Sequence, residues 1–246
     1  RIRYLVNRTI GANPDLIIIY TGENEFIYPQ LDFYNLVRVV TIAKNRSSLA
    51  KIAMYYVNLS QSPLQNKQST SRTGFPAYSA NRLFVNLKMS IFKTNIKKIV
   101  EETQNKNTSL LLVIPASNLA DWPPVKREVT NLGLPKGYKQ AQQEVTNLIE
   151  QNKLQEANQV VENSRALYGD DASFIYLKAE LAQMASLDSK DLYIKAKDAD
   201  PVPWRVTTAH ANFLKSRQDQ KTVWVLDAQE IFNQNSPGGI SGFNLS

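Results

Sequence analysis

Three short apolar runs, separated by longer stretches of helical spacing, set the expected architecture of this chain. The runs cover residues 16–20, 109–114 and 222–226 and consist mainly of Ile, Leu and Val. Between them, apolar side chains recur at intervals of three and four residues, as in amphipathic helices. Strands joined by long helical crossovers pair in parallel. We therefore expect an α/β fold.

The first apolar run also predicts how its strand is buried. Residues 16–20 read Leu-Ile-Ile-Ile-Tyr, with no polar position among them. Such uninterrupted runs are typical of strands that helices cover on both faces of a parallel sheet. We therefore expect this strand to be buried on both sides.

The connection from the first to the second apolar run is long and has three parts. Residues 31–59 show helical spacing, and residues 61–79 are rich in Ser, Gln, Asn and Pro, which predicts a surface loop. Residues 80–104 carry apolar side chains such as Leu87 and Ile91 on one helical face. The segment that leads into the second strand is therefore predicted to be a long amphipathic helix.

Residues 137–199 differ from the rest of the chain because they are almost purely helical. The spacing predicts four short helices, at residues 138–150, 154–168, 172–185 and 189–199. From Tyr138 to Ala172 the chain advances by the 34 residues of a tetratricopeptide repeat. Two repeats are fewer than the roughly three needed for independent stability, so this segment should lean on the α/β core. It would either form a groove that binds a peptide or protein partner, or serve only as a lid or as an insert that packs on the core.

The pattern divides the chain into three parts. Residues 1–136 form the first part of the α/β core, residues 137–199 a helical insertion, and residues 200–246 the return to the core. With 43% hydrophobic and 21% charged residues over 246 positions, the chain can bury a sizeable core. No stretch reaches the roughly 18 to 20 apolar residues that span a bilayer, so we expect no membrane segment in this chain.

The composition limits the chemistry that this chain can perform. Without cysteine it has no disulfide, thiol nucleophile or thiolate metal site, and a single histidine excludes a histidine-rich metal centre. The net charge of +7 suggests nucleic acid as a partner. The basic residues are spread out, however, which favours solvated helix faces, and we expect no nucleic-acid partner.

A polar turn at residues 21–25 follows the first apolar run and is the leading candidate site. It lies at the carboxyl end of the strand, the edge where open α/β sheets bind ligands. Gly22 allows a sharp backbone turn, and Asn24 can aim its NH2 group at an oxyanion. The alternative is that Asn24 only caps the next element.

Further candidates follow the other two strands and the helical insertion. Asn118 belongs to the same carboxyl edge, either as a substrate contact or, more simply, as a cap of the turn before a Trp-Pro-Pro sequence. Asp227 ends the third strand and is expected to cap the next turn. Arg205 either binds an anionic substrate group or forms a structural ion pair. His210 is expected to pack in a helix rather than to act as a base.

The sequence Gly22-Glu23-Asn24-Glu25 resembles the third conserved block of the SGNH (GDSL-like) hydrolases, Gly-x-Asn-Asp, with Glu25 in the acidic position. Four further segments are similar to those of a bacterial subgroup of SGNH proteins, which carries tetratricopeptide-like helices inserted in the hydrolase domain. These are residues 113–124, 200–205, 223–228 and 236–242. The similarity spans most of the chain in scattered blocks.

This resemblance implies a flavodoxin-like, three-layer parallel sheet with an all-helical insertion. It implies a serine-dependent acyl hydrolase or acyl transferase that needs no metal or organic cofactor and acts on an ester-bearing small molecule or glycan. Asn24 would donate to the oxyanion, Gly22 would form the turn, and Glu25 would hold the loop. Asn118 and Arg205 are the speculative substrate-binding residues. The subgroup is typical of the bacterial periplasm or envelope.

Three blocks of the family are missing from these 246 residues. The chain contains no Gly-Asp-Ser for the nucleophile, no glycine block for the second oxyanion donor, and no Asp-x-x-His for the base. This predicts an internal fragment without esterase activity of its own. The alternative from another class is a protein-interaction module that uses residues 137–199 on a scaffold without catalysis, and a structural envelope protein is a third interpretation.

Overall fold

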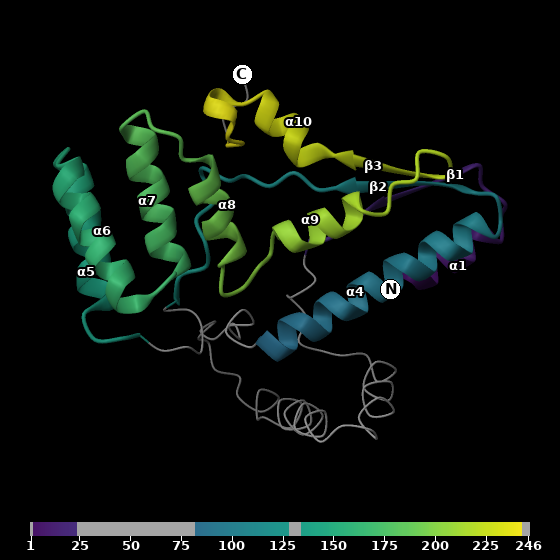
Figure 1. The fold of residues 1–246 in the computed structure, drawn as a ribbon, viewed down its shortest axis with the longest axis horizontal. Helices are drawn as coiled ribbons and strands as arrows, with labels where there is room; N and C mark the ends of the chain where they lie inside the picture. Colours follow the sequence, from purple (N-terminus) through teal and green to yellow (C-terminus); the bar gives the residue numbers. More distant parts are fainter. Residues whose placement is uncertain (1, 24–81, 128–133, 243–246) are drawn as a thin grey trace, which may run out of the picture.

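A parallel sheet of three strands organises the part of the chain that the computed structural model describes, which is residues 2–23, 82–127 and 134–242 (Figure 1). The strands are β1 (Leu16–Tyr20), β2 (Ser109–Ile114) and β3 (Val223–Asp227), and they lie in the order β1-β2-β3. The predicted α/β class and parallel pairing are confirmed. The third strand begins and ends one residue later than predicted.

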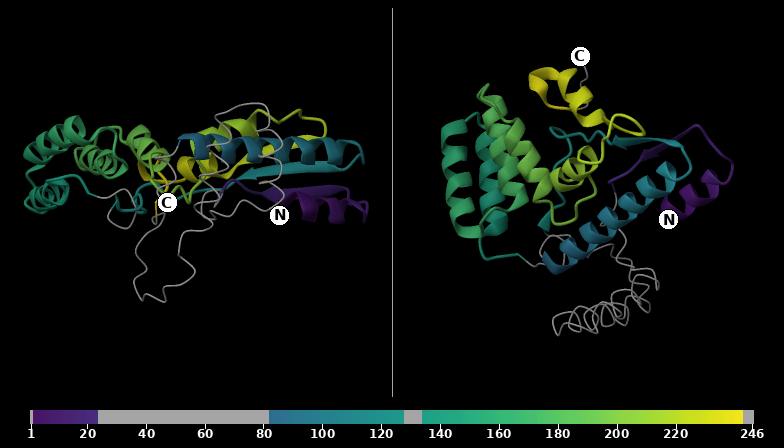
Figure 2. Two further views of the ribbon diagram at one scale, coloured as in Figure 1. Left: turned by 90° about the horizontal axis from the view of Figure 1, so that it is seen from below. Right: turned by 45° about the vertical axis from the view of Figure 1, so that its right-hand side comes forward.

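One face of the sheet forms the main core together with helices α1 (Ile2–Ile10), α4 (Arg82–Gln104) and α9 (Thr208–Lys215). The pairing register places residues of all three strands side by side on this face: Ile17 with Leu110 and Val223, and Ile19 with Leu112 and Val225. Helices α1 and α4 contact each other across it (Figure 2). The periodicity argument had not identified α1, while it placed α4 within two residues of its observed start.

The opposite face of the sheet is partly open, and here the prediction for the first strand is wrong. Successive side chains of a strand point to opposite faces. Ile17 and Ile19 are buried, whereas Leu16, Ile18 and Tyr20 are 47%, 61% and 59% exposed. Helices α1, α4 and α9 all pack against the same side of the sheet, and in the described part of the chain β1 is covered on that side only. The three-layer arrangement implied by the family resemblance therefore stays a prediction.

The helical insertion has the four predicted helices: α5 (Tyr138–Glu150), α6 (Leu154–Tyr168), α7 (Ala172–Met184) and α8 (Lys190–Asp198). Each packs against the next, so that they form a stack beside the sheet (Figure 2). Leu119 and Ile240 of the α/β part pack against side chains of α7 and α8. Helices α7 and α8 thus share a hydrophobic cluster with the α/β part of the chain.

The side chain of Asp171 fixes the start of α7 against its neighbours. Its carboxylate accepts a hydrogen bond from the backbone N–H of Ser173 and caps the helix. The same carboxylate accepts from the hydroxyl of Tyr138 in α5 at 2.7 Å and pairs with Arg127 at 3.4 Å. One acidic residue therefore joins two helices of the stack to the segment that precedes it.

The C-terminal part of the described chain contains two short helical elements after β3. They are α10 (Ala228–Gln234) and a 3-10 turn at Pro237–Gly239. The side chain of Asp227 accepts from the backbone N–H of Glu230 and caps α10, as predicted. Among the described helices, none combines the length and apolar composition that a bilayer crossing requires. The predicted helix at 31–59 and loop at 61–79 lie outside the described residues.

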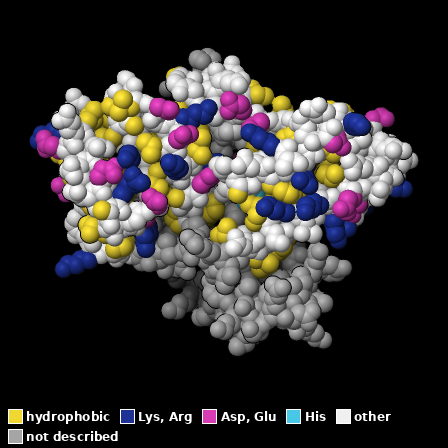
Figure 3. All heavy atoms as spheres, in the orientation of Figure 1, with side chains coloured by type: hydrophobic (Ala, Val, Ile, Leu, Met, Phe, Trp, Pro, Cys, Tyr) yellow, Lys and Arg dark blue, Asp and Glu magenta, His cyan; other side chains and the backbone are white. Residues whose placement is uncertain are grey.

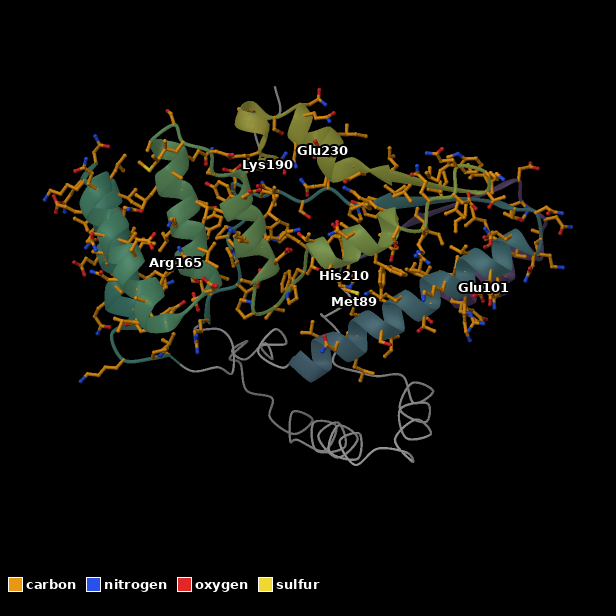
Figure 4. The ribbon with its side chains drawn as sticks, viewed as in Figure 1. Met89, Glu101, Arg165, Lys190, His210 and Glu230 are labelled. Atoms are coloured by element: carbon orange, nitrogen blue, oxygen red, sulfur yellow. The ribbon has the colours of Figure 1, made fainter. Side chains whose placement is uncertain are left out.

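His210 is a fully buried packing residue, in agreement with the sequence interpretation. Helix α9 begins at Thr208 because the Thr207 side chain accepts a hydrogen bond from the His210 backbone N–H and caps the helix. The imidazole Nδ1 lies 2.7 Å from the Thr207 hydroxyl, and the ring packs edge-on against Phe92 of α4 at 4.7 Å (Figure 4). Burial lowers the pKa of His210 to about 4.

Replacing His210 by Asn should reduce the acid sensitivity of the fold. In the unfolded chain the imidazole takes up a proton near the ordinary histidine pKa of 6.5, whereas in the native state it stays neutral until the pH falls to its lowered pKa of about 4. The wild type should therefore lose up to about 3 kcal/mol more stability than the variant between pH 7 and pH 4. Urea unfolding at both pH values measures this difference.

The comparison between the two proteins removes the contribution of other groups. Burial raises the pKa of Asp200 to about 6 and that of Glu180 to about 7, and both act in the opposite direction, since the native state then holds the extra proton. These carboxyl groups are present in the wild type and in His210→Asn, so their contributions to the pH dependence of stability cancel when the two proteins are compared. Equal pH profiles of the wild type and His210→Asn would contradict the assignment.

Candidate functional site

A cavity of about 430 Å³ lies at the carboxyl edge of the sheet, where the chain leaves β1 and β2. The segments that surround it come from both sides of the helical insertion and from the C-terminal turn. Its lining residues are Glu23, Ala116, Ser117, Asn118, Trp122, Trp204, Arg205, Phe232, Ser241 and Gly242. This is the edge where the sequence predicted a site, and where open parallel sheets bind ligands.

Gly22 forms the turn that brings the chain from β1 to this cavity. Its φ of +113° lies in a region that side chains rarely adopt, and an added Cβ would approach Val206 to 3.3 Å. Glu23 follows and lines the cavity, and burial raises the pKa of its carboxyl group. Asn24 and Glu25 lie outside the described residues. Their roles as oxyanion donor and loop support remain predictions.

Ser117 lines the cavity and carries a buried hydroxyl group that no described residue uses. The residue is 7% exposed, and its Oγ has no hydrogen-bond partner in the described part of the chain. Its backbone is held on both sides: the N–H donates to Gln229 Oε1 at 2.8 Å, and the carbonyl accepts from the Ser241 hydroxyl at 2.7 Å. A buried polar group without a partner is unusual in a folded protein.

No local sequence signal assigns a role to Ser117. The residues that hold its backbone are 112 and 124 positions away in the chain. Only the folded structure leaves the hydroxyl buried and without a partner.

Asn118 and Arg205 adopt the structural roles that the sequence offered as alternatives. The Asn118 side-chain oxygen accepts from the backbone N–H of Asp121 at 2.7 Å and caps that turn. Arg205 Nη1 donates to the carbonyls of Asn118 (3.1 Å) and Trp122 (2.7 Å), and Nη2 lies 3.5 Å from Asp200. Both residues line the cavity, but the contacts shown here are to the protein itself.

Asp200 completes this arrangement from the other side. It accepts hydrogen bonds from the backbone N–H groups of Val125 and Val202 in addition to its pairing with Arg205. Burial is the main reason that its pKa is raised, and the guanidinium and backbone amides oppose this effect. The pair ties the segment after β2 to the segment that leaves the insertion. It thereby fixes two walls of the cavity.

Aromatic side chains provide most of the remaining wall. Trp122 and Phe232 are about half exposed at the cavity, and Trp204 is partly buried next to Arg205. An apolar wall with a few polar groups, here Ser117 and Glu23, is typical of a small-molecule site. The arrangement suits a ligand that has an apolar part and a hydrogen-bonding group.

The described residues do not assemble a metal site or a catalytic triad. No group of three or more His, Asp or Glu side chains among them is placed to hold a metal ion. His210 lies in the core against Phe92 and does not line the cavity. On the face shown in Figure 3, Lys and Arg side chains alternate with Asp and Glu instead of gathering in one patch.

Arg205→Met should destabilise the fold strongly. The variant leaves the Asp200 carboxylate buried without its cation, which typically costs about 3 to 5 kcal/mol. The matched control is Lys190→Met, because Lys190 pairs with Glu230 at 3.8 Å on the surface (Figure 4), where the expected loss is below about 1 kcal/mol. Urea unfolding of both variants measures the contrast. Similar losses would show that the buried pair has no special role.

Comparison with known proteins does not assign the chain to a family. No protein-family model matches the sequence, and neither a curated protein nor a solved structure matches it. The interpretation of the cavity therefore depends on the residues that form it and on the resemblance of the sequence blocks.

Proposed function

We propose that this chain forms part of a serine-dependent hydrolase of the SGNH type and supplies its oxyanion donor and its substrate cavity. The reaction is hydrolysis or transfer of an acyl ester. One observation carries the proposal: the turn at Gly22 and Glu23 leads directly to a cavity at the carboxyl edge of the sheet, and Glu23 itself lines this cavity. The position of Asn24, next in the chain after Glu23, matches the asparagine of the family block.

Each part of the chain has a distinct task in this mechanism. Asn24 donates an amide N–H to the negative oxygen that develops on the ester carbonyl during attack. The aromatic side chains of the cavity wall hold the apolar part of the ester. Gly22 allows the backbone turn that the arrangement requires, since a side chain would be strained there.

The nucleophile and the base belong to the Gly-Asp-Ser and Asp-x-x-His blocks, which these 246 residues do not contain. The serine attacks the carbonyl carbon, and the histidine accepts its proton and returns it to the leaving alcohol. Water or a second alcohol then releases the acyl group by the same route. No step requires a metal or an organic cofactor.

Asn24→Ala should slow a protein that combines this chain with the serine and histidine blocks. Loss of one oxyanion donor typically lowers kcat by about 100 to 1000-fold, with little change in KM, because the interaction is formed in the transition state. Asn212→Ala, an exposed asparagine of α9, is the matched control and should leave kcat unchanged. Steady-state kinetics with p-nitrophenyl acetate provides the measurement. An unchanged kcat for Asn24→Ala would remove the oxyanion role.

The chain by itself should not hydrolyse esters, since its sequence contains neither the Gly-Asp-Ser block nor the Asp-x-x-His block. Incubation with p-nitrophenyl acetate and labelling with a fluorophosphonate probe test this directly. We expect a rate equal to the buffer blank and no stoichiometric labelling. Labelling of one serine per chain would show that the nucleophile lies within these residues, and the division of tasks proposed here would be wrong.

A further inference from the structure

A second cavity, of about 290 Å³, lies where the helical insertion meets the segment after β2. Helices α5, α7 and α8 and the turn at residues 120–121 form its walls. The lining residues are Ala120, Asp121, Ile149, Glu180, Gln183, Met184 and Tyr193. None of them lines the cavity at the edge of the sheet. The hydrolase proposal therefore does not account for it.

Glu180 gives this cavity a half-buried carboxyl group without a cation. It makes no hydrogen bond or ion pair with any described residue, and burial raises its pKa to about 7. The nearby Lys178 of the same helix is directed to Glu162. Carboxylates that are removed from water normally acquire a positive partner. Glu180 retains the cost of burial without that compensation.

The electrostatic surroundings of Glu180 are negative, although the whole chain carries a net charge of +7. Burial is the main reason that the pKa values of Tyr176 and Tyr193 are raised, and the negative charges of Glu180 and Asp121 raise both further. Arg205 acts on Tyr176 in the opposite direction and is already paired with Asp200. The cavity therefore favours a positive ligand.

The walls beside Glu180 are apolar and, in part, rigid. The Tyr193 ring is buried, and its hydroxyl donates to Gln183 Oε1 at 2.6 Å, which fixes the ring. Ile149 and the half-exposed Met184 complete this side. A long aliphatic stem that ends in a cation matches such a site, because the stem packs on apolar surface while the charge meets the carboxylate. Lysine and arginine side chains have this chemistry.

We propose that this cavity binds a lysine or arginine side chain of a partner polypeptide. The ammonium or guanidinium group pairs with Glu180, and the methylene groups lie along Ile149, Met184 and Tyr193. Charge complementarity selects the occupant, and the exposed Met184 and Leu187 near the end of α7 offer apolar surface to the residues that flank it. The site is independent of the hydrolase, since it shares no lining residue with the first cavity.

Titration calorimetry with the full chain tests the proposal with three short peptides of the same length. The first carries a central lysine, the second an arginine, and the third a norleucine, which keeps the stem and lacks the charge. We expect binding of the first two and at least about tenfold weaker binding of the third. Free butylammonium serves as a fourth probe and should bind more weakly than the lysine peptide, because it lacks flanking residues.

Glu180→Gln is the decisive variant, and Glu144→Gln on the exposed surface of α5 is its matched control. The first should lower the affinity for the lysine peptide at least about tenfold, whereas the second should not change it. In the wild type, affinity should rise from pH 6 to pH 8 as Glu180 loses its proton. The raised pKa values of Tyr176 and Tyr193 keep both neutral in this range. Asp200 also titrates near pH 6, and it is present in the wild type and in Glu180→Gln. If the affinity of Glu180→Gln does not change with pH, the pH dependence of the wild type comes from Glu180.

Three results would overturn the proposal. Equal binding of the lysine and norleucine peptides would exclude a cation site, and unchanged affinity in Glu180→Gln would exclude this carboxylate. Butylammonium that binds as tightly as the peptide would replace the polypeptide partner with a small amine. Circular dichroism checks that Glu180→Gln is folded, and if it is not, the peptide comparison on the wild type decides.

Discussion

A buried guanidinium–carboxylate pair connects parts of the chain that are far apart in sequence and borders the cavity at the edge of the sheet. Arg205 joins Asp200 to the backbone carbonyls of Asn118 and Trp122, more than eighty residues earlier. Charges this deeply buried are stable only when partners surround them. The folded chain must therefore close the segment after β2 onto the segment that leaves the helical insertion.

Further polar contacts join the end of α8 to the start of α9. Lys197 at the end of α8 donates to the carbonyl of Val206 at 2.6 Å and lies 3.3 Å from Asp198. Asp198 in turn accepts from the backbone N–H of Thr208 at the start of α9. Helix α9 then places Leu214 in the core beneath the sheet. The end of the insertion is thus held to the α/β part by specific polar contacts as well as by apolar packing.

The segment after β2 separates two sites of different chemistry. Asn118 and Trp122 line the cavity at the edge of the sheet, whereas Ala120 and Asp121 line the cavity against the helices. The first combines aromatic walls with an unused hydroxyl and suits a small ligand with an apolar part. The second has a free carboxylate and suits a cationic side chain. Acyl chemistry and partner binding can therefore be tested separately in this chain.

Local sequence determined the strands, most helices and the turn at Gly22. Side-chain periodicity and capping residues such as Asp171 and Asp227 act over a few residues, so a reading of the chain can find them. The position of the candidate site at the carboxyl edge followed from the same reading, because parallel strands bring their ends together. The role of Asn24 rests on the resemblance of its block to a family.

Tertiary structure alone decided which groups are buried and which lack partners. The run at residues 16–20 is apolar at every position, so its pattern does not reveal that helices cover one face and leave Ile18 exposed. The orphaned hydroxyl of Ser117 and the free carboxyl of Glu180 arise from packing between distant segments. Short-range patterns carry no information about such contacts, because burial and hydrogen-bond satisfaction depend on residues that are brought together only when the chain folds.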